Sequence, residues 1–236
     1  MDSRMKTGKY KVILFDLDHT LWDYERNARK TLSDLFDTYL EGLNGIERPA
    51  FQDEFIRIND VIWEQYDRGE ISRDDIRIVR FVEVLKLYGI DDQPLAHQMS
   101  MDYMKQGPYQ PHLVPGAKEL LDQLVEKYSL YVLTNGFEDV QNLKIRSSGI
   151  TDYFKEIITS EKAGAKKPAP GVFEYALQRA GCSKEESVMV GDNLLTDIAG
   201  SINYGMDAVF YNPKKKEHNA PVKYEISHLL ELSDIL

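Results

Sequence analysis

Short apolar segments alternate with helical segments along the second half of the chain, and this alternation constrains the fold more than any other feature. Short strands that alternate with helices of about ten residues build a parallel sheet with helices on both faces. We therefore predict an α/β fold with a doubly wound, Rossmann-like parallel sheet. The apolar segments are 11–16, 130–133, 156–159, 187–190 and 208–211, and the helical segments are 117–127, 138–148, 171–180, 195–204 and 227–236.

Residues 22–105 follow a different pattern. Apolar residues recur there at helical spacing without an intervening strand, and breaks near 42–49, 68–70 and 89–94 divide the stretch into four helices. We predict a core domain made of residues 1–21 and 106–236, with a four-helix domain, 22–105, inserted after the first strand.

Composition excludes several classes of protein. The net charge of −10 disfavours binding to a nucleic-acid polymer or to an anionic membrane. Cys182 is the one cysteine, so the chain forms neither an internal disulfide nor a cysteine-built metal site. No run of about 18 apolar residues is present, and the first apolar run is too short for a signal peptide. We expect a cytoplasmic protein, and the sequence does not indicate its oligomeric state.

Polar clusters follow four of the predicted strands. In an open α/β sheet, ligands bind at the carboxyl ends of the strands, so these clusters should meet at one edge. They are Asp16-Leu17-Asp18-His19-Thr20, Thr134-Asn135-Gly136, Lys166-Lys167-Pro168, and Gly191-Asp192-Asn193 with Asp197.

These residue types together favour phosphoryl transfer. Clustered carboxylates need a cation or protons to coexist, and oxygen ligands select a hard ion such as Mg²⁺. Thr134, the backbone N–H groups of Asn135 and Gly136, and Lys167 would bind a phosphoryl group. Asp16 can then act as the nucleophile that forms an aspartyl-phosphate, and Asp18 as the general acid and base.

The chain resembles the haloacid dehalogenase-like hydrolase superfamily, whose members are mostly phosphatases. The resemblance covers nearly the whole chain and rests on Asp16-Leu17-Asp18-His19-Thr20, Thr134, Lys167-Pro168 and the stretch from Gly191 to Asp197. It implies catalytic roles for Asp16, Asp18, Thr134 and Lys167, and phosphate binding by these residues with Leu17, Asn135 and Gly136. It also implies that Asp16, Asp192 and the Asp18 carbonyl bind Mg²⁺. Thr20, Asn193 and Asp197 would contact these ligands and not the ion itself. Lysine directly before proline favours Lys167 over Lys166.

The inserted helices lie between Asp16 and Thr134, the position of the family's helical cap. The stretches 15–23, 66–71, 167–168 and 190–192 look most like the bacterial pyrimidine 5′-nucleotidase branch. That resemblance implies a Mg²⁺-dependent phosphatase acting on a small phosphorylated metabolite, with a nucleoside 5′-monophosphate as its substrate. True haloacid dehalogenases lack the aspartate that stands here at Asp18.

Other functions remain open at this point. A sugar-phosphate or phosphoglycolate phosphatase would use the same core residues, as would a phosphomutase. A phospho-accepting receiver module would lack both the inserted helices and an acid/base such as Asp18, and a non-catalytic scaffold would depart from the pattern. Trp22, Tyr66 and Arg68 are candidates to contact substrate, although Trp22 and Tyr66 also fit core packing and Arg68 an exposed loop.

Overall fold

The computed structural model describes residues 8–43 and 45–236. Residues 1–7, which the predicted core segment 1–21 includes, lie outside the described part. The chain divides into two compact units, one ending at Asp23 and resuming from His112 to Leu236, the other spanning Tyr24–Pro111.

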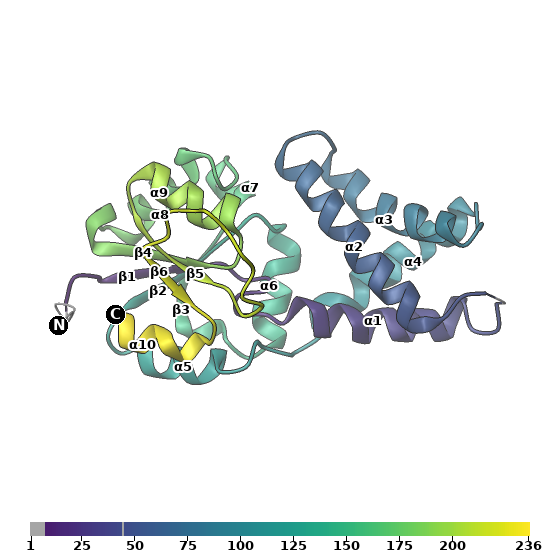
Figure 1. The fold of residues 1–236 in the computed structure, drawn as a ribbon, viewed down its shortest axis with the longest axis horizontal. Coiled ribbons are helices and arrows are strands. Elements are labelled where there is room, and N and C mark those ends of the chain that lie inside the picture. The colour runs from purple at the N-terminus through teal and green to yellow at the C-terminus, as the bar shows by residue number, and fades with distance from the viewer. Residues whose placement is uncertain (1–7, 44) are drawn as a thin grey trace. The chain divides into compact units, whose positions relative to one another are not determined.

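A six-stranded sheet forms the first unit, with the strand order β3-β2-β1-β4-β5-β6 and parallel pairing throughout (Figure 1). This confirms the predicted doubly wound α/β class. The strands are β1 (Val12–Phe15), β2 (Ser129–Thr134), β3 (Phe154–Thr159), β4 (Ser187–Gly191), β5 (Asp207–Tyr211) and β6 (Tyr224–Ile226).

The central strands consist mainly of apolar residues because helices cover both faces of the sheet. All four residues of β1 are buried. Leu14 faces a cluster that includes Leu133, Met189 and Phe173 of helix α8 (Pro170–Ala180). Alternation turns Ile13 and Phe15 toward the opposite face, which α5 (Ala117–Leu124) and α10 (Leu232–Ile235) cover in Figure 1.

The register of the sheet brings the predicted clusters to one level. Phe15 at the end of β1 pairs with Val132 of β2 and with Val190 of β4. The residues that follow each of these three strands therefore emerge at the same edge.

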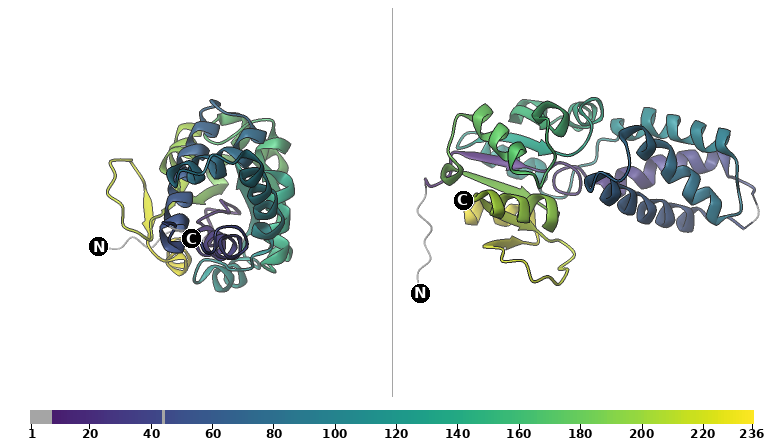
Figure 2. Two further views of the ribbon diagram at one scale, coloured as in Figure 1. Left: turned by 90° about the vertical axis from the view of Figure 1, so that its right-hand side faces the viewer. Right: turned by 90° about the horizontal axis from the view of Figure 1, so that it is seen from above.

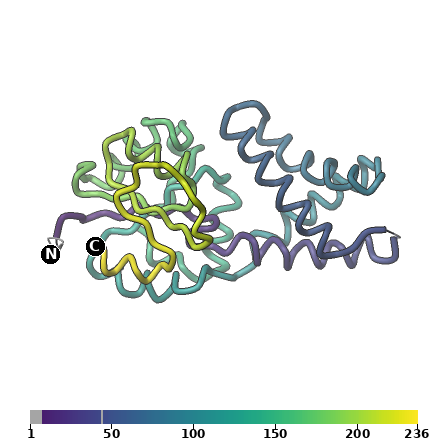
Figure 3. The backbone as a smooth tube through the Cα atoms, viewed as in Figure 1, coloured from purple at the N-terminus to yellow at the C-terminus, as the bar shows by residue number. Residues whose placement is uncertain are grey.

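Some elements differ from the prediction. The strand β6 was missed because its three residues, Tyr-Glu-Ile, alternate in burial at a sheet edge and form no apolar run. The predicted helix 227–236 is a 3₁₀ turn, Leu229–Glu231, followed by α10, which lies beside α5 (Figure 3). The predicted helix 195–204 begins as a π-helical turn, Leu194–Ala199, and continues as α9 (Gly200–Tyr204). The other α-helices in the described part of this unit are α6 (Glu138–Ser147) and α7 (Ser160–Ala163), of which α7 was not predicted.

Four helices form the second unit, where α1 contacts α2 and α4, and α3 contacts α2 and α4 (Figure 2). They are α1 (Tyr24–Tyr39), α2 (Arg48–Asp67), α3 (Arg73–Leu87) and α4 (Gln93–Gln106). Phe55 lies at the centre, with ring centroids 4.8 Å from Phe81 and 5.2 Å from Tyr103. A membrane-crossing helix must be long and apolar, and none in the described part of the chain is both.

Candidate active site

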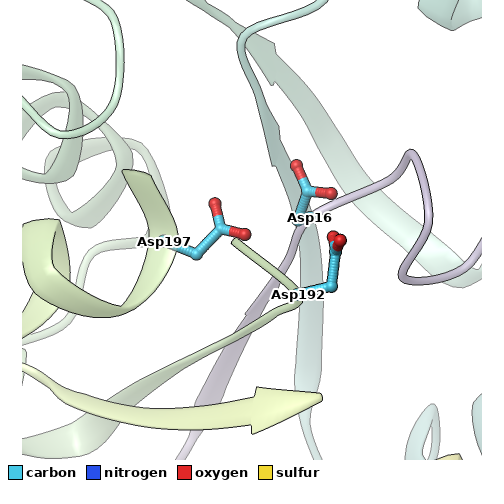
Figure 4. Close-up of side chains that lie close together, drawn as sticks. All are labelled: Asp16, Asp192 and Asp197. Atoms are coloured by element: carbon cyan, nitrogen blue, oxygen red, sulfur yellow. The ribbon is translucent and has the colours of Figure 1, made fainter. Parts of the chain in front are cut away.

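Three carboxylates converge at the carboxyl edge of the sheet. Asp16 follows β1, Asp192 follows β4, and Asp197 belongs to the π-helical turn Leu194–Ala199. One oxygen atom from each lies within 4.8 Å of the others, and Figure 4 shows the three side chains directed toward a common point. Asp197, which the sequence interpretation placed behind the ligands, supplies the third oxygen of this cluster and also contacts Lys167. The Asp18 carboxylate is not among its members.

Lys167 is the cation that accompanies this cluster. Its buried ammonium nitrogen lies 2.6 Å from Asp16 Oδ1 and 2.7 Å from Asp197 Oδ1, and it donates to the Leu133 carbonyl at 2.7 Å. Asn135 fixes the Lys167 backbone, because its Nδ2 donates to the Lys167 carbonyl and its Oδ1 accepts from the Lys167 N–H. Of the two adjacent lysines, it is Lys167 that contacts the candidate nucleophile.

Burial and mutual repulsion shift the protonation of the cluster. Burial, with the charges of Asp197 and Asp192, raises the pKa of Asp16 well above its ordinary value, although Lys167 opposes this. Burial and the charge of Asp197 raise the pKa of Asp192 to about 7, against a hydrogen bond from Thr20. Burial lowers the pKa of Lys167, but Asp16 and Asp197 outweigh it and leave the pKa raised. In the absence of a further cation, the cluster therefore favours holding protons.

Two residues of α6 surround the Asp18 carboxylate. Lys144 Nζ lies 2.5 Å from Asp18 Oδ1, and Gln141 Nε2 donates to Asp18 Oδ2 at 2.9 Å. Burial alone would raise the pKa of Asp18, but Lys144 and Gln141 outweigh it and lower this pKa. These contacts favour the carboxylate form of Asp18 when no substrate is bound. Sequence reasoning missed both residues, and the available signal was their spacing of three on a helix that follows Thr134.

Thr134 lies beside Asp18 and is buried. Its Oγ1 accepts a hydrogen bond from Gln141 Nε2 at 2.7 Å and one from the Gly136 N–H at 3.1 Å. A Cβ at Gly136 would lie 2.3 Å from Gln141 Nε2, so only glycine leaves room for this contact. Leu17, the other expected phosphate-binding residue, is buried, and its carbonyl accepts the N–H groups of Leu21 and Trp22.

Residues at the end of β4 and just after it leave room for the Asp197 carboxylate and bind it. A Cβ at Gly191 would lie 2.2 Å from Asp197 Oδ2, so a side chain there would displace this carboxylate. The Asn193 N–H donates to Asp197 Oδ2 at 3.1 Å, and Asn193 Oδ1 accepts from the N–H groups of Leu195 and Thr196. Thr20 Oγ1 lies 3.1 Å from Asp192 Oδ1. Thr20 and Asn193 therefore support the acidic cluster.

The other candidates for substrate contact are held in different ways. Trp22 is buried, and its ring lies under Lys144, 4.4 Å from the ring centroid to Nζ. Tyr66 packs edge-on against Trp63, and Arg68 pairs with Glu64 and Glu70 at the exposed end of α2. Tyr66 and Arg68 belong to the helical unit, whereas every residue of the acidic cluster belongs to the sheet unit.

Known proteins resemble this chain over nearly its whole length. The sequence matches the haloacid dehalogenase-like hydrolase family over residues 10–205. It is 34% identical to pyrimidine 5′-nucleotidase PynA of Streptococcus pneumoniae, covering 96% of this chain and 95% of that protein. It is 28% identical to pyrimidine 5′-nucleotidase YjjG of Escherichia coli, covering 97% and 98%.

A solved structure matches over nearly the whole length. The magnesium-bound putative HAD-hydrolase YfnB of Bacillus subtilis superposes with a TM-score of 0.86 at 30% identity, covering 96% of this chain and 98% of that one. The similarity between YfnB and this chain, in fold and in sequence, extends beyond the motif residues. The chain therefore belongs to the haloacid dehalogenase-like hydrolase family.

Proposed function

We propose that this hydrolase is a Mg²⁺-dependent phosphomonoesterase that forms an aspartyl-phosphate on Asp16. The observation that carries the proposal is the contact of Asp16 with Lys167 inside a cluster of three carboxylates, two of which, Asp16 and Asp197, are buried. A phosphoryl group carries negative charge that grows as it is transferred, so it needs fixed cations and hydrogen-bond donors around it. Lys167 and Thr134 are such groups: Lys167 contacts Asp16 directly, and Thr134 ends β2, which pairs with β1.

The residues present fit a Mg²⁺ ion. Asp16, Asp192 and Asp197 supply only oxygen atoms, and Lys167 is the cation paired with Asp16 and Asp197. Oxygen-only sites with few carboxylates suit Mg²⁺. Asp16, Asp192 and the Asp18 carbonyl would hold the ion, which supplies positive charge to a bound phosphoryl group.

The chain's own residues would act in two steps. The negative charge of a bound phosphoryl group raises the pKa of Asp18, which takes up a proton before the first step. An Asp16 oxygen then attacks phosphorus while the bond from phosphorus to the leaving oxygen breaks, and Asp18 gives that oxygen its proton. Asp18, now a carboxylate, then takes a proton from water, whose oxygen attacks phosphorus. The bond to Asp16 breaks, releasing inorganic phosphate and restoring the Asp16 carboxylate.

For the substrate, we propose a small phosphorylated metabolite of the nucleoside 5′-monophosphate class. The names of PynA and YjjG support this class. A 32% identical relative is a glyceraldehyde 3-phosphate phosphatase of Methanothermobacter thermautotrophicus, which keeps sugar phosphates as the second candidate. A panel of nucleoside monophosphates, sugar phosphates and phosphoglycolate, scored by phosphate release, separates these classes. An isomerised product without free phosphate would instead indicate a phosphomutase.

One observation raises a dehalogenase alternative. The chain matches a solved 2-haloacid dehalogenase of Pseudomonas syringae at 28% identity, with a TM-score of 0.64. A halide leaves without a proton, whereas an alkoxide leaving from phosphorus requires one. Asp18 is therefore useful for a phosphate ester and superfluous for a haloacid, and we expect no halide release from 2-chloropropionate.

The deciding experiment compares wild type with Asp16→Asn on p-nitrophenyl phosphate and on the metabolite panel. Asp16→Asn removes the nucleophilic carboxylate, so turnover should fall to background while circular dichroism stays unchanged. Asp122→Asn, at an exposed position on α5, is the matched control and should retain wild-type turnover. Chelation with EDTA should stop the wild type, and added Mg²⁺ should restore it. Full turnover by Asp16→Asn would refute the proposal.

A further inference from the structure

Two buried polar side chains on α6 connect groups that the proposed mechanism uses separately. Gln141 and Lys144 stand three residues apart, on one face of the helix, and both are buried. A buried lysine is uncommon unless it is paired. Its partner here is Asp18, and the partners of Gln141 are Asp18 and Thr134.

The contacts of Gln141 determine where the Thr134 hydroxyl proton points. A hydroxyl has one donor and two acceptor positions. Both acceptor positions of Thr134 Oγ1 are taken, by Gln141 Nε2 and by the Gly136 N–H. The reverse orientation of the Gln141 amide would place its oxygen against the Asp18 carboxylate, so the donor orientation is the favoured one. The Thr134 proton is thereby left to donate to a third group.

Lys144 and Gln141 also fix the rotation of the Asp18 carboxylate. Lys144 contacts Oδ1 and Gln141 donates to Oδ2, so each oxygen is held by a different residue. The Lys144 ammonium itself rests over the Trp22 ring. Such a cation–π contact restricts the ammonium to one side of the ring.

We propose that Gln141 and Lys144 are positioning residues of the reaction, an inference that rests on the proposed phosphatase function. Gln141 directs the Thr134 proton toward a bound phosphoryl oxygen. Lys144 holds the Asp18 carboxylate where it accepts a proton from the water that attacks the aspartyl-phosphate. In that step the water O–H bond breaks, the proton goes to Asp18, the new bond to phosphorus forms and the bond to Asp16 breaks.

The test for Lys144 uses rapid-mixing kinetics with p-nitrophenyl phosphate. p-Nitrophenolate leaves without protonation, so the first step should survive in Lys144→Met while the second step slows. We expect kcat to fall about a hundredfold and KM to fall with it, because kcat/KM is set by the first step, which is unchanged. A burst of p-nitrophenolate approaching one per active site should precede the slow phase. Lys144→Arg keeps a cationic donor beside Asp18 and should recover most of kcat.

The test for Gln141 uses inhibition by inorganic phosphate. Gln141→Met keeps the length of the side chain but donates no hydrogen bond to Thr134. The inhibition constant for phosphate and KM should each rise about tenfold, because the loss of one hydrogen bond weakens binding by about that factor. A loss of packing alone would lower the active fraction and leave the inhibition constant unchanged.

Arg146→Met is the matched control, because Arg146 is an exposed cation on the same helix. It should behave as wild type. If Lys144→Met does not fold, Trp22→Leu removes the ring beneath Lys144 and should give the same burst with a smaller loss of kcat. The inference would be overturned if Lys144→Met or Trp22→Leu showed no burst. It would also be overturned if Gln141→Met left the inhibition constant for phosphate unchanged. A wild type inactive on every phosphomonoester would instead refute the proposed function.

Discussion

A carboxylate at the position of Asp192 destabilises the folded chain unless a cation neutralises it. Asp192 follows the buried strand β4, its own charge faces that of Asp197, and Thr20 is the hydroxyl that supports it. Burial and Asp197 together raise its pKa to about 7. The folded chain without Mg²⁺ therefore binds a proton more tightly than the unfolded chain does.

The sign of the resulting pH dependence follows from linkage. A raised pKa in the folded state gives stability that is fully present below the unfolded pKa of about 4 and is lost as the pH rises through about 7. We expect the metal-free protein to lose on the order of 2 kcal/mol of unfolding free energy, relative to Asp192→Asn, between pH 5 and pH 8. Urea denaturation in EDTA measures this difference. Mg²⁺ should remove most of the loss at pH 8, and a difference that does not vary with pH would contradict the assignment.

Lys167 should contribute to stability as well as to catalysis. Its removal leaves Asp16 and Asp197 facing each other in a buried site without their shared cation. Breaking a buried ion pair from one side typically costs about 3–5 kcal/mol. We therefore expect Lys167→Met to lower the urea midpoint sharply at pH 8, and less at pH 5, where Asp16 with its raised pKa takes up a proton more readily.

The neighbouring Lys166 provides the control for this variant. Lys166→Met makes the same change one residue earlier, without touching the contacts of Lys167. It should lower the unfolding free energy much less than Lys167→Met does, because Lys166 is less buried than Lys167. Equal destabilisation by both variants would show that the effect is not specific to the contact with Asp16 and Asp197.

At the scale of elements, the sequence was informative where burial is periodic. The apolar strands β1, β2 and β4 and the helices α2 and α3 were identifiable because each buries a continuous run or a regular stripe. The elements β6 and α7 were not, because three or four residues contain too few positions to reveal a period.

The residues of the site also differ in whether the sequence made them identifiable. Asp16, Thr134 and Asp192 were identifiable because each lies at or just after the carboxyl end of a strand, and the register of a parallel sheet brings strand ends together. Lys167, in the loop between α7 and α8, was identifiable from the proline that follows it. Gln141 and Lys144 were not, because helical spacing shows that they share a face without showing what packs against it. Their contacts with Asp18 join positions more than a hundred residues apart, which depends on the assembled sheet.

The first turn of helix α3 allows a prediction about stability. Helix α3 begins with a capping box, in which Ser72 Oγ accepts from the Asp75 N–H and the Asp75 carboxylate accepts from the Ser72 N–H. Ser72→Ala leaves an N–H group at the start of the helix without its partner and should cost about 1 kcal/mol. Thermal denaturation measures the loss. Ser72→Thr keeps the oxygen and should restore nearly all of it; failure to do so would exclude the cap as the cause.

At the scale of the whole molecule, the helical unit is inserted through two adjoining segments of the sheet unit. The Asp23 N–H donates to the His112 carbonyl at 3.1 Å, and the Val114 N–H donates to the Leu21 carbonyl at 2.9 Å. Trp22 and Leu113 form an antiparallel bridge between the same segments. The points where the chain leaves and re-enters the sheet unit are thus hydrogen-bonded neighbours.

This arrangement predicts that the sheet unit folds without its insertion. Replacing Tyr24–Pro111 with a short Gly-Ser linker joins two segments that are already adjacent, so loop closure costs little. Because Asp16, Asp192, Asp197 and Lys167 all lie in the sheet unit, the excised chain should unfold cooperatively. It should also bind Mg²⁺ within about tenfold of the full chain, a difference of about 1.4 kcal/mol measured by calorimetry. The same excision carrying Asp192→Asn should lose Mg²⁺ binding, which separates the acidic cluster from adventitious sites. An excised chain that folds but does not bind the ion would show that the carboxylates of the sheet unit do not suffice to hold it.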